Sequence, residues 1–436
     1  MPAEATASTA ASISIAAVQL PKRLAVMGAQ QIWKDLGAHG TLSCTGYGLN
    51  IAFLGLRSTM LRLIQGTSSR TVAHARWRGF GSVPSKMKAI EIRPKYAKDH
   101  PQYKRPSADD LVVGELPVPK PGPGEVLIKV AAAGVNGPDL MQRLGLYDPP
   151  KGHSPVLGLE VSGEIVDVGE GVEQHTVGDR VCALANGGGY AEFCAVPAGQ
   201  ALRIPTGIGM VEAACIPETF FTVWYNLFLQ TNVLGERMFD RYPKPSLLVH
   251  GGSSGIGTTA IQLARAFGSD CVLATAGSEE KCKACLDLGA TAAVNYRDPD
   301  VSFDKVVLEK TDRKGVDIVL DMVVGKEYTQ KNLNALRRGG RMAIIGFKGG
   351  AKVQVNMTQV LTKALTISGS TLRTCPDATK ALIASELGAR VWPMFESGQL
   401  RVVMDSSFPM SEAAAAHRKM ETSKHIGKIA IVVGDA

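Results

Sequence analysis

The stretch Leu247-Leu248-Val249-His250-Gly251-Gly252-Ser253-Ser254-Gly255-Ile256-Gly257 decides the fold, because a short apolar run passes directly into a glycine-rich turn. Apolar residues then recur at the spacing of one helix face, which predicts a helix over 256–267. Glycines permit a sharp turn and let backbone N–H groups approach a pyrophosphate, which the positive end of the helix stabilises. This order predicts a dinucleotide site, and the alternative is a purely structural turn. The predicted contacts are Gly252, Ser253, Gly255, Ile256 and Gly257.

The end of the next predicted strand, 271–276, bears on which dinucleotide binds. It runs into Gly277 and Ser278 with no carboxylate at its tip, where an NAD site usually places Asp or Glu on the ribose hydroxyls. The hydroxyl of Ser278 and the ammonium group of Lys281 would accept a 2′-phosphate. We therefore predict NADPH, with Glu279 and Glu280 pointing to solvent. The alternative is that Lys281 is a solvated surface charge.

Strands and helices alternate around this turn, with short connections between them. Apolar runs predict strands at 247–250, 271–276, 292–295, 316–322, 341–346 and 365–370. Helical patterns lie between them at 256–267, 279–288 and 328–336, after a broken helix over 212–229 and before helices at 378–396 and 411–421. This alternation predicts an α/β fold with a doubly wound parallel sheet covered by helices on both faces.

The segment from Met87 to about residue 212 has a different pattern. Short β-type runs at 126–132, 163–168, 180–185 and 191–196 are separated by glycine- and proline-containing turns, which is typical of a β-barrel-like domain. A last apolar run at 428–433 is predicted to return to this β-rich domain. The doubly wound domain would then be an insert.

Composition restricts the class of protein. The chain of 436 residues is 45% hydrophobic and 20% charged, which provides for a large core. No apolar run reaches the ~18 residues that a membrane span requires, so no span is predicted. Of the net charge of +8, residues 1–86 carry +7, from nine Lys and Arg against two acids. Because the remainder is nearly neutral, we predict no nucleic-acid partner.

The basic N-terminal segment, 1–86, is rich in Ser, Ala and Thr and poor in acids, which is the composition of an organellar transit peptide. The stretch Arg78-Gly79-Phe80-Gly81-Ser82 resembles a mitochondrial processing site. We predict mitochondrial targeting. The alternatives are an unstructured extension, or translation from Met60 or Met87 and a cytoplasmic protein. The eight cysteines are scattered and are predicted to be free thiols, including Cys282 and Cys285 of the single CxxC.

From Met87 to the C-terminus the chain resembles the quinone oxidoreductase branch of the medium-chain dehydrogenase/reductase superfamily. The segments that carry the resemblance are Ala132–Arg143, Gly145–Pro150, Leu157–Gly163, Val177–Val181, Gly187–Glu192, Thr275–Ser278 and His425–Ile429. The resemblance implies a GroES-like catalytic domain over 87–212 and 373–436, with an inserted Rossmann domain over 213–372. It also implies a homodimer that pairs through the strand at 365–370.

The resemblance adds cofactor contacts to those of the glycine turn. It implies that Tyr296 lies near the adenosine phosphate together with Ser278 and Lys281. Gly346 and Phe347, at the end of the 341–346 strand, complete the predicted cofactor contacts.

Zinc-dependent relatives differ at two positions that matter for the chemistry. They carry Cys where this chain has Asn136 and His where it has Leu159, and many carry a four-Cys lobe that this sequence lacks. Because catalytic zinc needs about three protein ligands, we predict no metal. Without metal or flavin, a hydride from NADPH can still reach an acceptor that is already electrophilic, such as a quinone or an α,β-unsaturated carbonyl.

Asn136 and Tyr147 are the predicted catalytic residues, as hydrogen-bond donors to the acceptor oxygen. Tyr147 could also deliver a proton. The alternatives are loop capping for Asn136 and packing at the cleft rim for Tyr147, and we expect Asp139 and Glu160 to be structural. For the whole protein, the alternatives to a quinone reductase are an enoyl-thioester or alkenal reductase and a non-catalytic NADPH-binding protein.

Overall fold

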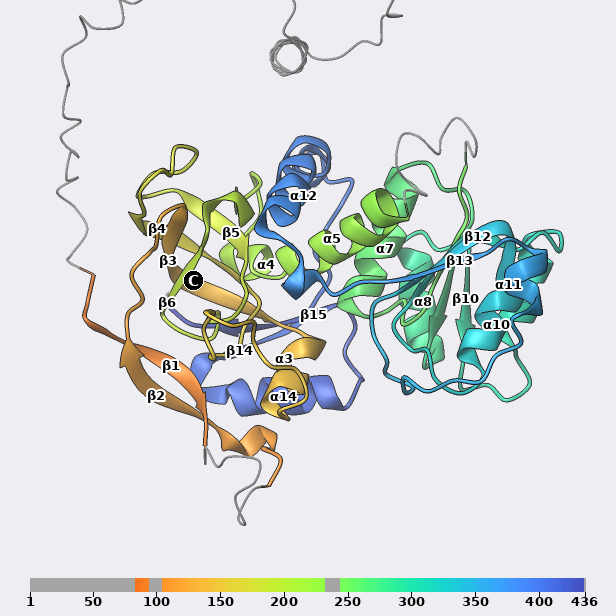
Figure 1. The fold of residues 1–436 in the computed structure, drawn as a ribbon, viewed down its shortest axis with the longest axis horizontal. Helices are drawn as coiled ribbons and strands as arrows, with labels where there is room; N and C mark the ends of the chain where they lie inside the picture. The colour runs from red at the N-terminus through yellow and green to blue at the C-terminus, as the bar shows by residue number, and fades with distance from the viewer. Residues whose placement is uncertain (1–82, 94–103, 232–243, 435–436) are drawn as a thin grey trace, which may run out of the picture. The chain divides into compact units, whose positions relative to one another are not determined.

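The computed structural model describes residues 83–93, 104–231 and 244–434 (Figure 1). The chain divides into two units, Met1–Arg78 and Gly79–Ala436, and the fold below belongs to the second. The predicted targeting segment lies outside the described residues apart from its last four, 83–86. Mitochondrial targeting and the domain limits therefore stay predictions.

Six parallel strands form the sheet that the glycine turn predicts. Their order is β10-β9-β8-β11-β12-β13. The bounds are Leu247–Val249 for β8, Val272–Ala276 for β9, Ala292–Asn295 for β10, Val316–Asp321 for β11, Leu336–Ile344 for β12 and Thr366–Gly369 for β13. The strand order reverses between β8 and β11, so the carboxyl ends of these central strands form the switch point at which doubly wound sheets bind ligands. The prediction of a doubly wound parallel sheet is confirmed.

Alternate residues of the central strands enter different cores. Leu247 and Val249 pack with the helices on one face, whereas Leu248 packs with a second cluster on the other. This follows from the two-residue period of a strand and explains why β8 is apolar throughout. The helices around the sheet are α7 (Gly255–Ala266), α8 (Glu279–Asp287), α9 (Phe303–Lys310), α10 (Tyr328–Ala335) and α11 (Thr358–Thr362).

The β-rich part forms a second sheet of seven strands, in the order β14-β15-β3-β4-β5-β7 with β6 paired to β3. The bounds are Glu125–Val135 for β3, Glu160–Val168 for β4, Arg180–Leu184 for β5, Phe193–Pro197 for β6, Ala201–Arg203 for β7, Met404–Pro409 for β14 and Lys428–Val432 for β15. The closing strand β15 runs antiparallel to β3, with Ile429 opposite Val135. The last strand of the chain thus completes the sheet begun by the first part, as Figure 1 shows.

Further elements connect these sheets. They are β1 (Lys86–Ile92), β2 (Leu111–Pro117), α3 (Gly137–Arg143), α4 (Met210–Ala213), α5 (Pro217–Trp224), a π-helical turn (Tyr225–Gln230), α12 (Asp377–Arg390), α13 (Trp392–Glu396), α14 (Ala413–Glu421) and 3-10 turns at Ala108–Asp110, Ala198–Gln200, Leu372–Thr374 and Met410–Glu412. None of the helices within the described ranges is long and apolar enough to cross a membrane. The seven described cysteines are free thiols, as predicted.

Several features differ from the sequence prediction, which did not include the helices α3, α9 and α11. The helix predicted over 378–396 is two helices, because Pro393 cannot donate a backbone hydrogen bond and α13 begins next to it. The pair β1–β2 and the strand β14 were not predicted. In β14 the sequence is MDSSFP, whose polar residues do not alternate with apolar ones, so periodicity gives no signal.

Replacing Gly257 by Ala tests the glycine turn. A Cβ at this position would lie 2.3 Å from the carbonyl oxygen of Gly251 and 2.5 Å from the Cα of Gly252, and neither backbone atom can move freely. We predict that Gly257→Ala lowers the free energy of unfolding in urea by about 1–3 kcal/mol. The control is Gly388→Ala inside α12, where the nearest atom is a leucine methyl at 3.3 Å. If the two variants are equally stable, the turn is not as tightly packed as described.

Candidate active site

The glycine turn connects β8 to α7 at the switch point. Gly251 has a φ of +63°, and Ser254 caps α7 by accepting a hydrogen bond from the Gly257 amide at 3.1 Å. The closing segment of the chain meets this turn, because the Gly427 amide donates to the Ser253 carbonyl at 2.8 Å. The turn therefore lies at the junction of the two sheets.

The predicted contacts for the adenosine end come together beyond β9. Ser278 caps α8, and the ring of Tyr296 lies over Gly277, where an added Cβ would be 2.7 Å from the tyrosine hydroxyl. The ammonium group of Lys281 donates to the Ser423 carbonyl at 2.6 Å. Glu279 and Glu280 are exposed, as predicted.

Additional basic groups surround Lys281. Burial and the charges of Arg297 and Lys348 lower the pKa of Lys281. The pKa of His425 is lowered to about 4 by burial and by Lys281 and Lys348. Positive groups that disfavour one another's protonation form an environment that favours an anion. Arg297, Lys348 and His425 were not predicted, although Arg297 follows Tyr296 and Lys348 follows Phe347 directly in the sequence.

Gly346 and Phe347 follow β12 on the same side of the sheet. Gly346 packs against Met322, since a Cβ there would be 3.3 Å from the Met322 carbonyl oxygen. Met322 in turn approaches the hydroxyl of Ser254 with its sulfur at 3.9 Å. Phe347 is 59% exposed, which leaves its ring free to cover a ligand. The structure thus gathers the predicted cofactor contacts along the carboxyl ends of the strands.

Asn136 lies in a closed hydrogen-bond network. Its side-chain nitrogen donates to Glu160 Oε1 at 2.9 Å and to the Gly134 carbonyl at 3.3 Å, and its side-chain oxygen accepts from Lys428 Nζ at 2.6 Å. Asn136 also directly precedes α3, and its backbone N–H donates to Asp139 Oδ2 at 2.8 Å. The side-chain donors are directed at protein acceptors, so a substrate oxygen would have to displace the longer contact to Gly134.

A buried ion pair organises this network. Lys428 Nζ lies 2.6 Å from Glu160 Oε1, and the side chains are 5% and 0% exposed. The second oxygen of Glu160 accepts the backbone N–H of Glu218 at 2.8 Å. Burial alone would lower the pKa of Lys428, but the charge of Glu160 raises it overall. Lys428 therefore stays charged, and its strand β15 is tied to β4 and α5.

Asp139 supports the neighbouring loop. It accepts the amides of Asn136 at 2.8 Å and Gly158 at 2.9 Å, and the Tyr190 hydroxyl at 3.3 Å. Burial raises its pKa to about 6. Glu160 lies two residues after Gly158. Asp139 therefore also fixes the segment that carries the Glu160–Lys428 ion pair.

Tyr147 is half-buried beneath Arg373. The guanidinium carbon lies 5.4 Å from the centre of the tyrosine ring. Arg373 is held by the Asn186 carbonyl at 2.6 Å and by Gln142 at 2.8 Å. Burial, followed by the charge of Glu218, raises the pKa of Tyr147, so its hydroxyl keeps its proton. The role of Tyr147 as a donor to the acceptor stays a prediction, and Arg373 and Glu218 are neighbours that the sequence did not reveal.

No group of three or more His, Cys, Asp or Glu side chains suited to a metal ion occurs among the described residues. Leu159, which occupies the second position at which zinc-dependent relatives carry a ligand, is buried. A hydrogen-bonding and electrostatic site therefore fits these side chains better than a metal centre does.

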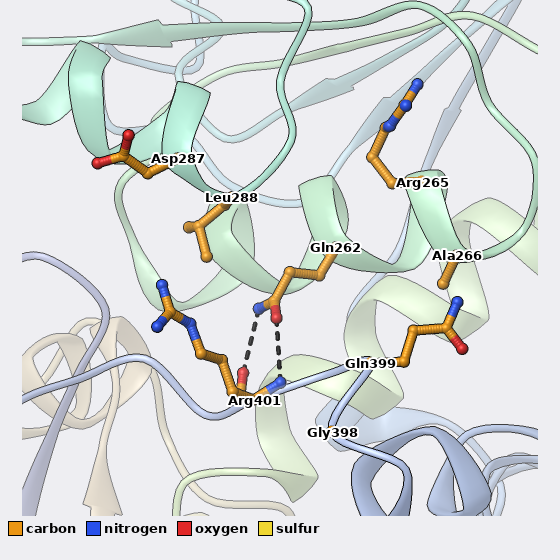
Figure 2. Close-up of a pocket in the computed structure, with 8 residues that line it drawn as sticks. All are labelled: Gln262, Arg265, Ala266, Asp287, Leu288, Gly398, Gln399 and Arg401. Atoms are coloured by element: carbon orange, nitrogen blue, oxygen red, sulfur yellow. Dashed lines mark hydrogen bonds between the residues drawn. The ribbon is translucent and has the colours of Figure 1, made fainter.

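A surface cavity of about 480 Å³ lies at the far end of α7 (Figure 2). Gln262 crosses its wall and pairs with the backbone N–H and C=O of Arg401, both at 3.1 Å. None of the predicted site residues lines this cavity. The two hydrogen bonds of Gln262 hold Arg401 against α7.

Comparisons with known proteins show the family to which the chain belongs. The alcohol dehydrogenase GroES-like domain matches residues 122–206, and the zinc-binding dehydrogenase domain matches 255–386. The quinone oxidoreductase of Lama guanicoe is 34% identical over 324 residues, covering 73% of this chain and 92% of that protein. A crystal structure of an NAD-dependent alcohol dehydrogenase is 31% identical with a TM-score of 0.66, covering 80% of this chain and 100% of that one.

Two further solved structures are similar. Escherichia coli quinone oxidoreductase complexed with NADPH is 25% identical with a TM-score of 0.65, covering 79% of this chain and 100% of that chain. The JamJ enoyl reductase in its apo form is 25% identical with a TM-score of 0.67, covering 80% and 99%. The fold and the nucleotide turn define an oxidoreductase of the medium-chain dehydrogenase/reductase superfamily. Within it, the chain belongs to the zinc-free quinone oxidoreductase-like branch.

Replacing Lys428 by Met tests the buried pair. Glu160 would keep an uncompensated charge, so we predict a loss of about 3–5 kcal/mol in the free energy of unfolding. The double variant with Glu160→Gln should recover part of this loss in a double-mutant cycle followed by urea unfolding. The matched control is Lys86→Met, which removes a surface pair with Glu115 and should cost less than about 1 kcal/mol. Strictly additive effects of the two buried substitutions would show that the pair is not coupled.

Proposed function

We propose that this protein is an NADPH-dependent quinone reductase that transfers a hydride to quinones or related electrophilic carbonyls without metal or flavin. The basic groups Lys281, Arg297 and Lys348 beside Ser278 carry the cofactor part of this proposal, because they favour a 2′-phosphate. The acceptor part rests on the resemblance to quinone oxidoreductases. The alternative of a solvated Lys281 is disfavoured by its burial and its bond to Ser423.

Separate groups of residues bind the cofactor and contact the acceptor in this proposal. NADPH, when bound, supplies a hydride from C4 of its nicotinamide ring. The amides of the glycine turn and the start of α7 hold the pyrophosphate, and Tyr296, Gly346 and Phe347 border the nucleotide. Tyr147 donates a hydrogen bond to the acceptor oxygen as negative charge develops there. Asn136 holds Glu160 and Lys428 in place. Its side-chain nitrogen is the second candidate donor to the acceptor oxygen.

A panel of acceptors tests the reaction. We expect NADPH oxidation with 1,2-naphthoquinone and 1,4-benzoquinone. Turnover confined to crotonyl-thioester would replace the quinone assignment by an enoyl-thioester reductase, which the likeness to an enoyl reductase structure makes the second candidate. Tight NADPH binding with no turnover of any acceptor would favour a non-catalytic binding protein.

Replacing Tyr147 by Phe tests the proposed donor. Tyr147→Phe should lower kcat by about 10²-fold or more with the fold intact. Unchanged kinetics would show that Tyr147 only packs at the rim of the site.

Charge reversal at Lys281 tests the cofactor preference. Loss of a charge-assisted hydrogen bond costs about 1.5–3 kcal/mol, so Lys281→Glu should raise the KM for NADPH by about tenfold or more and leave the KM for NADH nearly unchanged. The control is Lys283→Glu on the same helix, whose side chain is 74% exposed. Equal effects on both dinucleotides would remove Lys281 from the phosphate site.

We also propose a homodimer formed through the free edge of β13. Apolar side chains are exposed in and near this edge strand: Ile367 at 40%, Leu361 at 82% and Met357 at 56%. Ile367→Asp should convert the dimer to a monomer in sedimentation equilibrium. Val113→Asp, at a residue with a similar exposure of 43%, should not. A wild-type protein that is monomeric at micromolar concentration would contradict the proposal.

A further inference from the structure

Glu218 lies in the first turn of α5, close enough to Tyr147 for its charge to raise the pKa of that residue. It is the second residue of α5, and its backbone N–H is held by Glu160 at 2.8 Å. The next residue, Thr219, contacts α7 through a hydrogen bond from Thr259 at 3.1 Å and lies against Gly255, where an added Cβ would be 3.2 Å from its methyl group. The same Gly255 position faces the stem of Lys428. Glu218 is thus fixed beside the nucleotide turn.

The carboxyl group of Glu218 differs from the other buried carboxylates of the cleft. Asp139 and Glu160 are saturated with donors, whereas the Glu218 carboxyl has no hydrogen-bond or ion-pair partner among the residues that the structure describes. Glu218 is only partly buried, so its side chain is not sealed from solvent. A half-buried carboxylate without a partner is costly, and protonation removes that cost.

The charged and titratable groups around this carboxyl come from six segments. They are Asp139 near the start of α3, Tyr147 after α3, Glu160 in β4, Arg373 before α12, Lys380 within α12 and Lys428 in β15. Two acids, three bases and one phenol nearly balance. Burial therefore affects the pKa of Glu218 more than any single neighbouring charge does.

We propose that Glu218 is a further catalytic residue, a carboxylic acid that gives its proton to the acceptor oxygen beside Tyr147. This inference rests on the function proposed above. The hydride brings two electrons to the acceptor and leaves the dinucleotide oxidised. The Glu218 O–H bond breaks as the new O–H bond forms on the acceptor, and the resulting carboxylate takes a proton back from solvent. For a quinone, the hydride and this proton together complete the hydroquinone.

Quinones and enones each take up one hydride and one proton in a turnover. A quinone plus one hydride and one proton gives a hydroquinone, and an enone plus one hydride and one proton gives an enol that becomes the saturated ketone. Water takes part only in restoring Glu218 and in any exchange that follows. Each turnover therefore uses one proton from Glu218.

The titration of Glu218 supports this assignment. Burial, followed by the charge of Glu160, raises its pKa to about 8, while Lys428 and Arg373 oppose the shift. An ordinary glutamic acid is ionised at neutral pH, but this one keeps its proton there and loses it as the pH rises through about 8. A general acid is most effective when its pKa lies near the working pH.

The first test is kinetic. Single-turnover oxidation of NADPH by 1,2-naphthoquinone should slow as the pH rises through about 8 in the wild type. Glu218→Gln should lower the rate at neutral pH by about 10²-fold and abolish that alkaline decline. Glu218→Asp keeps an acid, so it should retain the decline at reduced rate. Glu212→Gln, an exposed neighbour, is the matched control. A Glu218→Gln rate within about threefold of wild type, with the decline intact, would overturn the proposal.

The second test needs no cofactor and no acceptor. Infrared difference spectra of the full chain, titrated with base, should show the band of a protonated carboxyl group that disappears near pH 8 in the wild type and is missing in Glu218→Gln. Equal melting temperatures establish that the variant is folded. Absence of the band in the wild type would refute a protonated Glu218. If the band is present and no acceptor reacts, the proposed function fails while the proton-holding group stands.

Discussion

The contact between Lys428 Nζ and Glu160 Oε1, at 2.6 Å and almost wholly buried, joins three parts of the chain. Lys428 begins the last strand, Glu160 begins β4, and the second oxygen of Glu160 holds the start of α5 at Glu218. Two buried charges are tolerated only because each compensates the other and because Asn136 supplies further hydrogen bonds. The Lys428–Glu160 ion pair therefore stabilises the junction between the sheets, and loss of either residue removes that stabilisation.

The same pair holds the nucleotide turn close to Asn136 and Glu160. The stem of Lys428 lies so close to Gly255 that a Cβ there would be 2.5 Å from its Cδ. The closing segment also bonds the turn through Gly427. As a result, the end of the chain contributes to both sides of the site. The glycine turn itself follows β8 at the carboxyl ends of the central strands, where a doubly wound sheet binds its ligand.

Sequence reasoning predicted the features that have a local signal. The apolar strand, the glycine turn and the helix period lie within one stretch, and the parallel sheet follows from the alternation of strands and helices. Buried charges have no such signal: Glu218, Arg373 and Lys428 come from distant segments and meet only after folding. Asn136 follows β3, where a loop was predicted, but its side-chain amide is bound to Glu160 and Lys428, which neither spacing nor resemblance could indicate. The polar strand β14 was missed for lack of alternation.

The proposed function requires that a hydride pass from NADPH to an electrophilic acceptor in a site without metal. Its most direct test is a single turnover of the chelator-treated protein with NADPH deuterated at C4 and an α,β-unsaturated ketone, followed by mass spectrometry of the product. We predict that deuterium from one face of the nicotinamide appears at the β-carbon of the saturated ketone. A product that carries no deuterium, or a reaction that requires added zinc, would contradict it.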